Sequence, residues 1–255
     1  MPTILPRAIV CDLDGTLAES KQPIDSEMAE LISRILTRSH FSVLGGGKSE
    51  LFFTQVTGPL AEVGTEHFHR LGLFPTSGAR GYTYAHGVWK QSYAELLTPT
   101  DIEKIFNAFT EAFAETGYAH PDELFGPVLE DRGTAVVFSA AGQHAPVTVK
   151  ETWHTHHDVR HTLREFLASQ LHEFEVKLGG LTSIDVTRKG IDKAYGIQKI
   201  KEIFGLETDA IVFIGDALFP GGNDEPVRST GITCLPVKSP EDTKVIFKTW
   251  LSAAA

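Results

Sequence analysis

Two hydrophobic patterns alternate at the beginning and at the end of the chain. Short apolar runs rich in β-branched residues are typical of strands buried on both faces of a sheet. Such runs occupy residues 8–11, 41–44, 210–214 and 232–236. Apolar residues at helical spacing predict amphipathic helices at residues 25–36, 191–204 and 240–251, and in the stretch after Lys48. Because strands alternate with helices, we expect a parallel sheet covered on both sides.

The middle of the chain has a different pattern. It predicts helices at residues 101–116 and 158–170, a β pair around residues 132–138 and a strand at residues 174–178. This mixture favours an inserted α+β unit rather than more of the parallel sheet. The predicted fold class is therefore α/β, with a doubly wound parallel sheet formed by residues 1–92 and 182–255 and an inserted α+β cap at residues 93–181.

Composition narrows the classes of function. The net charge of -10 argues against binding nucleic acid or an anionic membrane surface. No stretch resembles a signal peptide or a membrane span, so we expect a cytoplasmic, soluble protein. The two cysteines, Cys11 and Cys234, lie in predicted strands and are expected to be small core residues in a reducing compartment. A histidine-rich stretch at residues 154–161 is better explained as a solvated helix start than as a metal site.

Candidate chemistry lies at the ends of two predicted strands. The segment AIVCDLDGTL, residues 8–17, ends its apolar run in Asp12 and Asp14, and the segment at 210–224 ends in Asp216 and Asp224. Open α/β sheets bind ligands at the carboxyl ends of their strands. Acids placed there are costly unless a cation or a reacting group uses them. A structural turn or part of a calcium loop is the alternative, but a calcium loop has a later glycine and lies between helices.

These segments resemble a known superfamily of phosphotransferases. The pattern D-x-D-G-T is similar to the nucleophile motif of the haloacid dehalogenase-like (HAD) superfamily, here subclass IIB. The loop G-D-x-x-x-P-G-G-N-D at residues 215–224 resembles that of the phosphomannomutase branch, as do the segments 132–138 and 179–186. The resemblance covers nearly the whole chain and implies a Rossmann-like HAD core with an inserted cap.

The resemblance also implies roles for individual residues. Asp12 would be the nucleophile, and Asp14 the general acid and base, with Thr16 hydrogen-bonded to it. Lys193, in the pattern G-x-x-K at residues 190–193, would neutralise the phosphoryl oxygens, and Lys189 is the competing candidate.

One carboxylate cannot hold Mg²⁺ in octahedral geometry, so further oxygen ligands are needed. The resemblance assigns the metal to Asp12, the backbone carbonyl of Asp14 and Asp216, with Asp224 and Asn223 in support. The expected cofactor is Mg²⁺.

A glycine-rich loop follows the second strand and precedes a helix. Its residues are Gly45, Gly46, Gly47 and Lys48. Consecutive glycines let backbone amides approach an anion closely, so this loop is the expected phosphate cradle. The family usually has a serine or threonine there, so either the amides act alone or Ser49 or Lys48 substitutes. The resemblance assigns substrate binding to Arg132, Ser183, Asp185 and Asn223.

The charge of the cap separates the candidate reactions. Residues 93–181 contain six Lys+Arg against fourteen Asp+Glu, a difference of -8, which would repel a second phosphate. The leading expectation is therefore a Mg²⁺-dependent phosphatase that acts on a small phosphorylated metabolite, first of all a sugar phosphate, through an aspartyl-phosphate.

Two alternatives stay open. One is a phosphomannomutase that interconverts hexose 1- and 6-phosphates, with the second phosphate held by Arg132, Arg160 or Arg164. The other is a catalytically silent relative that binds a phospho-ligand. The expected partner is the phosphorylated metabolite, and a homodimer formed through the cap is a further expectation.

Overall fold

The computed structural model describes residues 4–179 and 181–253 and divides the chain into two compact units. The core unit comprises Met1–Ala94 and Ile191–Ala255, and the cap unit comprises Glu95–Gly190. The cap unit extends past the expected boundary at 181, because β9 (Ser183–Arg188) pairs with two other strands of that unit. The sequence-based boundary, which puts the residues of β9 in the core, is therefore wrong.

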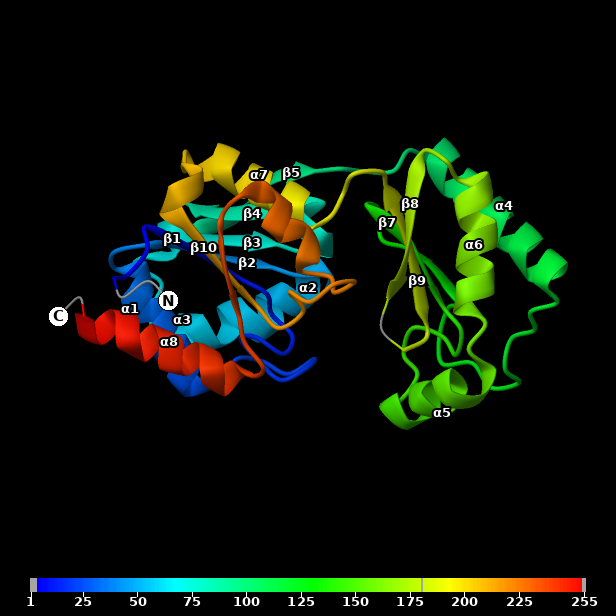
Figure 1. The fold of residues 1–255 in the computed structure, drawn as a ribbon, viewed down its shortest axis with the longest axis horizontal. Helices are drawn as coiled ribbons and strands as arrows, with labels where there is room; N and C mark the ends of the chain where they lie inside the picture. The colour runs from blue at the N-terminus through cyan, green and yellow to red at the C-terminus, as the bar shows by residue number, and fades with distance from the viewer. Residues whose placement is uncertain (1–3, 180, 254–255) are drawn as a thin grey trace. The chain divides into compact units, whose positions relative to one another are not determined.

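In the described part of the chain, the core unit holds a seven-stranded sheet in the order β11-β10-β1-β2-β3-β4-β5 (Figure 1). The strands are β1 (Ala8–Cys11), β2 (His40–Leu44), β3 (Leu71–Phe74), β4 (Arg80–Ala85), β5 (Val88–Ala94), β10 (Ile211–Gly215) and β11 (Thr233–Pro236). The strands from β11 to β3 in this order are parallel, and β4 and β5 add an antiparallel hairpin at one edge. The mostly parallel sheet confirms the predicted fold class.

Helices cover both faces of this sheet, as the buried strands require. They are α1 (Ser26–Leu36), α2 (Ser49–Phe52), α3 (Gly58–Val63), α7 (Lys193–Phe204) and α8 (Pro240–Ala253), with a π-helical segment η1 (Phe53–Thr57) and 3₁₀ turns η2 (Phe68–Arg70), η3 (Thr76–Gly78), η4 (Thr208–Ala210) and η5 (Glu225–Thr230). Ile9 and Cys11 of β1 belong to the apolar cluster with α1 and α8, whereas Val10 belongs to the cluster with α7. Figure 1 shows α1, α3 and α8 on one face of the sheet and α7 on the other.

The cap unit is built on an antiparallel sheet that, among the described residues, has four strands in the order β6-β7-β9-β8. Its elements are α4 (Pro99–Thr116), β6 (Leu129–Asp131), β7 (Ala135–Ser139), α5 (Val147–His157), α6 (Arg160–Gln170), β8 (Phe174–Gly179) and β9. Phe109 of α4, Phe138 of β7 and Leu163 of α6 share one buried cluster, so α4 and α6 pack on one face of this sheet. Helix α5 was not expected.

Two expectations from composition can be compared with the structure. Cys11 is buried and Cys234 is half-buried, and both are free thiols. Among residues 4–179 and 181–253, no helix has both the length and the apolar character needed to cross a bilayer.

Candidate active site

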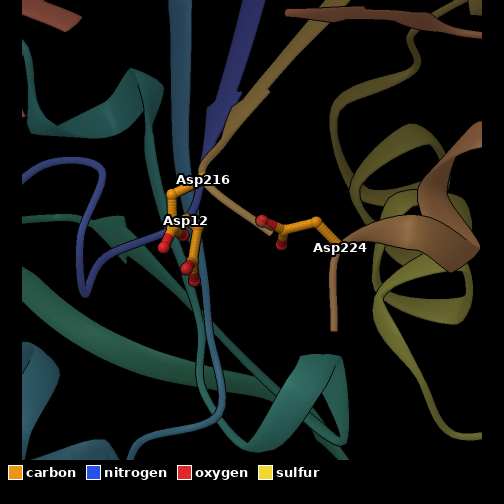
Figure 2. A group of neighbouring side chains, drawn as sticks. All are labelled: Asp12, Asp216 and Asp224. Carbon is orange, nitrogen blue, oxygen red and sulfur yellow. The ribbon is translucent and has the colours of Figure 1, made fainter. Parts of the chain in front are cut away.

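The carboxyl ends of β1 and β10 bring Asp12 and Asp216 to the same edge of the core sheet. The two strands pair in parallel with Cys11 opposite Ile214, so the residues that follow leave the sheet side by side. Asp224 enters from the loop after β10. One oxygen from each of the three carboxylates lies within 4.8 Å of the others. Figure 2 shows the side chains of Asp12 and Asp216 side by side, with the Asp224 carboxylate reaching toward them from the loop.

Lys193 is buried among these acids. Its side chain is 1% exposed, and Nζ donates to Asp12 Oδ1 at 2.7 Å and to Asp224 Oδ1 at 2.5 Å. Asp192 caps α7 by accepting a hydrogen bond from the amide of Tyr195, which places Lys193 in the first turn of the helix. The structure therefore brings Lys193 directly onto the expected nucleophile.

Burial and neighbouring charges both shift the pKa values of the residues at this site. Burial raises the pKa of Asp12 to about 6, although Lys193 opposes that rise. Burial, and then the charge of Asp224, raise the pKa of Asp216. Burial alone would lower the pKa of Lys193, but Asp12 and Asp224 outweigh it and raise the pKa. The lysine stays charged, and the three carboxylates around it retain an excess of negative charge that a further cation would offset.

The donor set fits a magnesium ion. Carboxylate oxygens are the ligands that Mg²⁺ prefers, and this edge offers them from three residues. Glycines give the carboxylates room: a Cβ on Gly15 would lie 2.7 Å from Asp216 Oδ2, and a Cβ on Gly215 would lie 2.3 Å from Asp224 Oδ2. The sequence showed both glycines, but nothing in it indicated that they pack against acids.

Asp224 is held by the protein at both of its oxygens. Oδ1 accepts from Lys193, and Oδ2 accepts from the amide of Ala217 at 3.0 Å. Asp224 is also completely buried. This arrangement favours Asp12 and Asp216 as the residues whose carboxylate oxygens are available to a metal ion. Asp224 would instead hold Lys193 in place.

The turn after Asp12 differs from the prediction in one contact. The hydroxyl of Thr16 donates to Asp216 Oδ1 at 3.4 Å, so its expected bond to Asp14 was wrong. Asp14 is exposed and lies outside the acidic cluster, and one of its carboxylate oxygens accepts from the amide of Lys21 at 2.6 Å. An exposed carboxylate next to the expected nucleophile is suitably placed to exchange a proton with a bound molecule.

The glycine-rich loop lies at the end of β2, the neighbour of β1 in the sheet. Gly45 packs on the expected nucleophile, because a Cβ there would lie 3.0 Å from Asp12 Oδ1. Its amide donates to the carbonyl of Phe74 at 3.2 Å, so Gly45 cannot offer that amide to a phosphate as expected. The amides of Gly46, Gly47 and Lys48 remain the candidates, and Gly46 has open space around its Cα.

Ser49 was one expected substitute for the missing hydroxyl of this loop. Its Oγ accepts a hydrogen bond from the hydroxyl of Tyr82 at 3.1 Å. Two other candidates are exposed. Asn223 lies beside Asp224 in the loop after β10, and Lys189 donates to the carbonyl of His172 in the cap unit. Lys193, rather than Lys189, is the lysine at the acidic cluster.

The expected substrate-binding residues of the cap lie close together in that unit. Ser183 and Asp185 are alternate residues of β9 and so share a face of the sheet. Arg132 lies in the turn between β6 and β7. Burial raises the pKa of Asp185, and the nearby charge of Arg132 offsets part of that rise. Its Nε donates to Glu130 at 2.8 Å and its Nη2 to Gln143 Oε1 at 2.8 Å. Sequence reasoning missed Gln143, because only the fold places it beside Arg132.

Comparison with known proteins gives the family. A family model described as eukaryotic phosphomannomutase matches residues 28–253. Phosphomannomutase 1 of Dictyostelium discoideum is 27% identical over 251 residues, which cover 95% of this chain and 96% of that protein. Phosphomannomutase 1 of Homo sapiens is 26% identical over 243 residues, which cover 91% and 87%.

Solved structures agree in fold. An IMP-nucleotidase of Plasmodium falciparum has a TM-score of 0.71 at 14% identity, covering 99% of this chain and 71% of that one. A haloacid dehalogenase-like hydrolase of Bacteroides thetaiotaomicron has a TM-score of 0.62 at 14% identity, covering 96% and 98%. The family match spans both the core and the cap regions, so the chain belongs to the phosphomannomutase family of HAD-superfamily enzymes.

Proposed function

We propose that this chain transfers the phosphoryl group of a hexose phosphate through Asp12. The observation that supports this reaction most strongly is the contact of Asp12 with the buried Lys193, beside Asp216 at the end of the neighbouring strand. Asp12, Asp216 and the backbone carbonyl of Asp14 would hold Mg²⁺. When bound, the ion would supply positive charge that offsets the repulsion between the carboxylate and the phosphoryl oxygens.

The chemistry assigned to the protein's own groups has two stages. In the first, an oxygen of Asp12 attacks phosphorus, the bond between phosphorus and the sugar oxygen breaks, and Asp14 donates a proton to that oxygen. Lys193 stabilises the charge on the phosphoryl oxygens. In the second, a hydroxyl group attacks the aspartyl-phosphate while Asp14 takes its proton, which restores Asp12.

The hydroxyl group that attacks the aspartyl-phosphate distinguishes a mutase from a phosphatase. We propose a phosphomannomutase, in which the accepting hydroxyl belongs to a hexose monophosphate. The transfer from Asp12 then gives a hexose bisphosphate, and return of its other phosphoryl group to Asp12 leaves the isomeric hexose monophosphate. The similarity to proteins named phosphomannomutase extends through the cap, and this supports the mutase over the phosphatase that we expected first.

A phosphatase remains the second candidate because of the contacts of the cap arginines. A mutase must hold a second phosphate, and Arg132, Arg160 and Arg164 were the residues considered for it. All three donate to protein acceptors within the cap unit. Arg160 is also buried, with 4% of its surface exposed. These contacts and the acidic character of the cap favour water as the acceptor.

One assay separates the candidates. The protein is incubated with Mg²⁺, mannose 1-phosphate and a catalytic amount of hexose 1,6-bisphosphate, and both mannose 6-phosphate and inorganic phosphate are followed. We expect mannose 6-phosphate to form faster than phosphate is released. Faster release of phosphate would assign the phosphatase instead. If neither product forms, and p-nitrophenyl phosphate is not hydrolysed either, the chain is a silent phospho-ligand-binding relative.

A further inference from the structure

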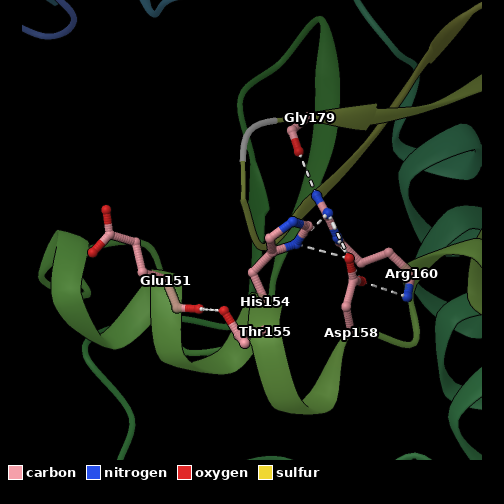
Figure 3. Close-up of polar contacts among 6 residues, drawn as sticks. All are labelled: Glu151, His154, Thr155, Asp158, Arg160 and Gly179. Atoms are coloured by element: carbon pink, nitrogen blue, oxygen red, sulfur yellow. Dashed lines mark hydrogen bonds and ion pairs between the residues drawn. The ribbon is translucent and has the colours of Figure 1, made fainter.

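Arg160 is a buried cation at the start of α6 in the cap unit. Its Nε and Nη2 donate to the two carboxylate oxygens of Asp158, at 2.8 and 2.7 Å. Nη2 also lies 3.0 Å from Nδ1 of His154, and Nη1 donates to the carbonyl of Gly179 at 2.8 Å. Figure 3 shows the guanidinium between the His154 ring, the Asp158 carboxylate and the Gly179 carbonyl. These contacts use all three guanidinium nitrogens.

The contact with Gly179 connects this network to β9. Gly179 ends β8 and pairs with Ser183 of β9 in the antiparallel register. It also packs against the next residue on that face, because a Cβ on Gly179 would lie 3.1 Å from Asp185 Oδ2. Arg160 therefore holds the backbone against which Ser183 and Asp185 lie.

A guanidinium suits this task better than other side chains. Its planar fork binds the Asp158 carboxylate at two points, which fixes the orientation of the third nitrogen toward Gly179. A lysine has one nitrogen and cannot reproduce this geometry. Since the Asp158 carboxylate satisfies the charge of Arg160, the arginine can remain buried without a ligand.

We propose that Arg160 is a positioning residue: it fixes the end of β8 and so orients Ser183 and Asp185 for recognition of the sugar. This inference rests on the proposed function, because it takes a hexose phosphate as the substrate. Arg160 then contributes to the binding of the sugar part and contributes nothing directly to phosphoryl transfer.

The test compares Arg160→Lys with Glu165→Gln. Glu165 lies on the same helix, but it is exposed. We expect Arg160→Lys to raise KM for mannose 1-phosphate about tenfold, roughly the effect of one charge-assisted hydrogen bond. Its kcat, and KM for p-nitrophenyl phosphate, which carries no sugar, should change by less than about twofold. Glu165→Gln should resemble the wild-type protein with both substrates.

Amide hydrogen exchange provides a second measurement that does not depend on the substrate. Peptides that cover β8 and β9 should exchange faster in Arg160→Lys, and not in Glu165→Gln. If Arg160→Lys fails to fold, Asp158→Asn, which removes the charge that aligns the guanidinium, should show the same effects more weakly. Unchanged exchange, equal effects on both substrates, or equal effects of Arg160→Lys and Glu165→Gln would overturn the proposal. A wild-type protein that hydrolyses p-nitrophenyl phosphate but ignores hexose phosphates would instead refute the proposed function, and the exchange data would still show whether Arg160 holds the strand.

Discussion

At the scale of single residues, the site depends on the balance between one buried lysine and the acids around it. Lys193 contacts Asp12 and Asp224, and none of these side chains is more than 6% exposed. In such a place the cost of removing charges from water is similar in size to their attraction. The pairing therefore contributes little net stability, but the loss of one partner leaves the others uncompensated.

Lys193→Met tests this balance. The variant leaves Asp12 and Asp224 without their cation, so we expect the free energy of unfolding in metal-free buffer to fall by about 3–5 kcal/mol. Added Mg²⁺ should restore part of the loss, since the site then carries more uncompensated negative charge. Urea unfolding with EDTA and with Mg²⁺ measures both effects. A loss below about 1 kcal/mol would show that the lysine is not the counter-ion of the acids.

Asp12→Asn tests the nucleophile. An amide oxygen is a poor nucleophile, so we expect kcat to fall at least about 10³-fold while the circular dichroism spectrum is unchanged. Asp209→Asn, which changes an exposed acid in η4 of the same unit, is the matched control and should keep full activity. Comparable rates for the two variants would contradict the assignment.

At this scale the sequence predicted the acids better than their partners. Asp12, Asp216 and Lys193 were identifiable because each belongs to a local pattern with a known chemical use. The contacts of Thr16 with Asp216 and of Gln143 with Arg132 were not, because each joins residues whose proximity depends on the fold. A short motif shows which side chains are present, and the sheet decides which of them meet.

At the scale of elements, the turn after β1 determines how closely the acids approach one another. Gly15 adopts φ 79°, in the left-handed region that favours glycine, and its Cα lies against Asp216. Gly87, in the turn between β4 and β5, has φ 81° but no atom within 4 Å of a built Cβ. The two glycines therefore have the same backbone requirement and different surroundings.

Gly15→Ala and Gly87→Ala separate these two effects. Both should destabilise the protein by about 1–2 kcal/mol, because alanine is strained at positive φ. Only Gly15→Ala should also weaken activation by Mg²⁺, because its methyl group displaces Asp216. We expect the Mg²⁺ concentration that gives half-maximal activity to rise about tenfold in this variant. Titration of activity with Mg²⁺ in both variants measures this. Equal titration curves would mean that Gly15 serves the turn alone.

The elements with strong apolar patterns were predicted well, but burial alone did not decide the outcome, because β3 is buried at all four residues and was missed. The strands β1, β2, β10 and β11 and helices α1, α4, α6, α7 and α8 were identifiable from strong apolar patterns. β4 and β5 are half-exposed at the sheet edge, so their polar residues weaken the pattern. β9 was placed in the wrong unit because its pairing with β7 joins segments far apart in sequence.

At the scale of the whole molecule, the buried acids link folding to pH and, under the proposed function, to magnesium. The pKa of Asp12 is about 6 in the folded protein against an ordinary value of 3.8. Between these values the folded state binds more protons than the unfolded state, so the stabilising contribution is present below pH 4 and is lost as pH rises to about 6.

The predicted fall in stability with rising pH can be tested in solution. In EDTA, the free energy of unfolding of the wild-type protein, relative to Asp12→Asn, should fall by on the order of 2 kcal/mol from pH 4 to pH 7. In Mg²⁺ the trend should weaken or reverse, because the metal binds the ionised carboxylates. Urea unfolding across this pH range gives both curves. A relative stability that rises with pH in EDTA would contradict the raised pKa of Asp12.

The central claim is that Asp12 itself accepts the phosphoryl group. Its most direct test is to quench the enzyme during turnover of a hexose phosphate with Mg²⁺, reduce it with borohydride and sequence the peptides by mass spectrometry. Reduction of an aspartyl-phosphate leaves homoserine, which we expect at position 12 and at no other acid. Homoserine at another position, or none from an enzyme that is turning over, would contradict the claim.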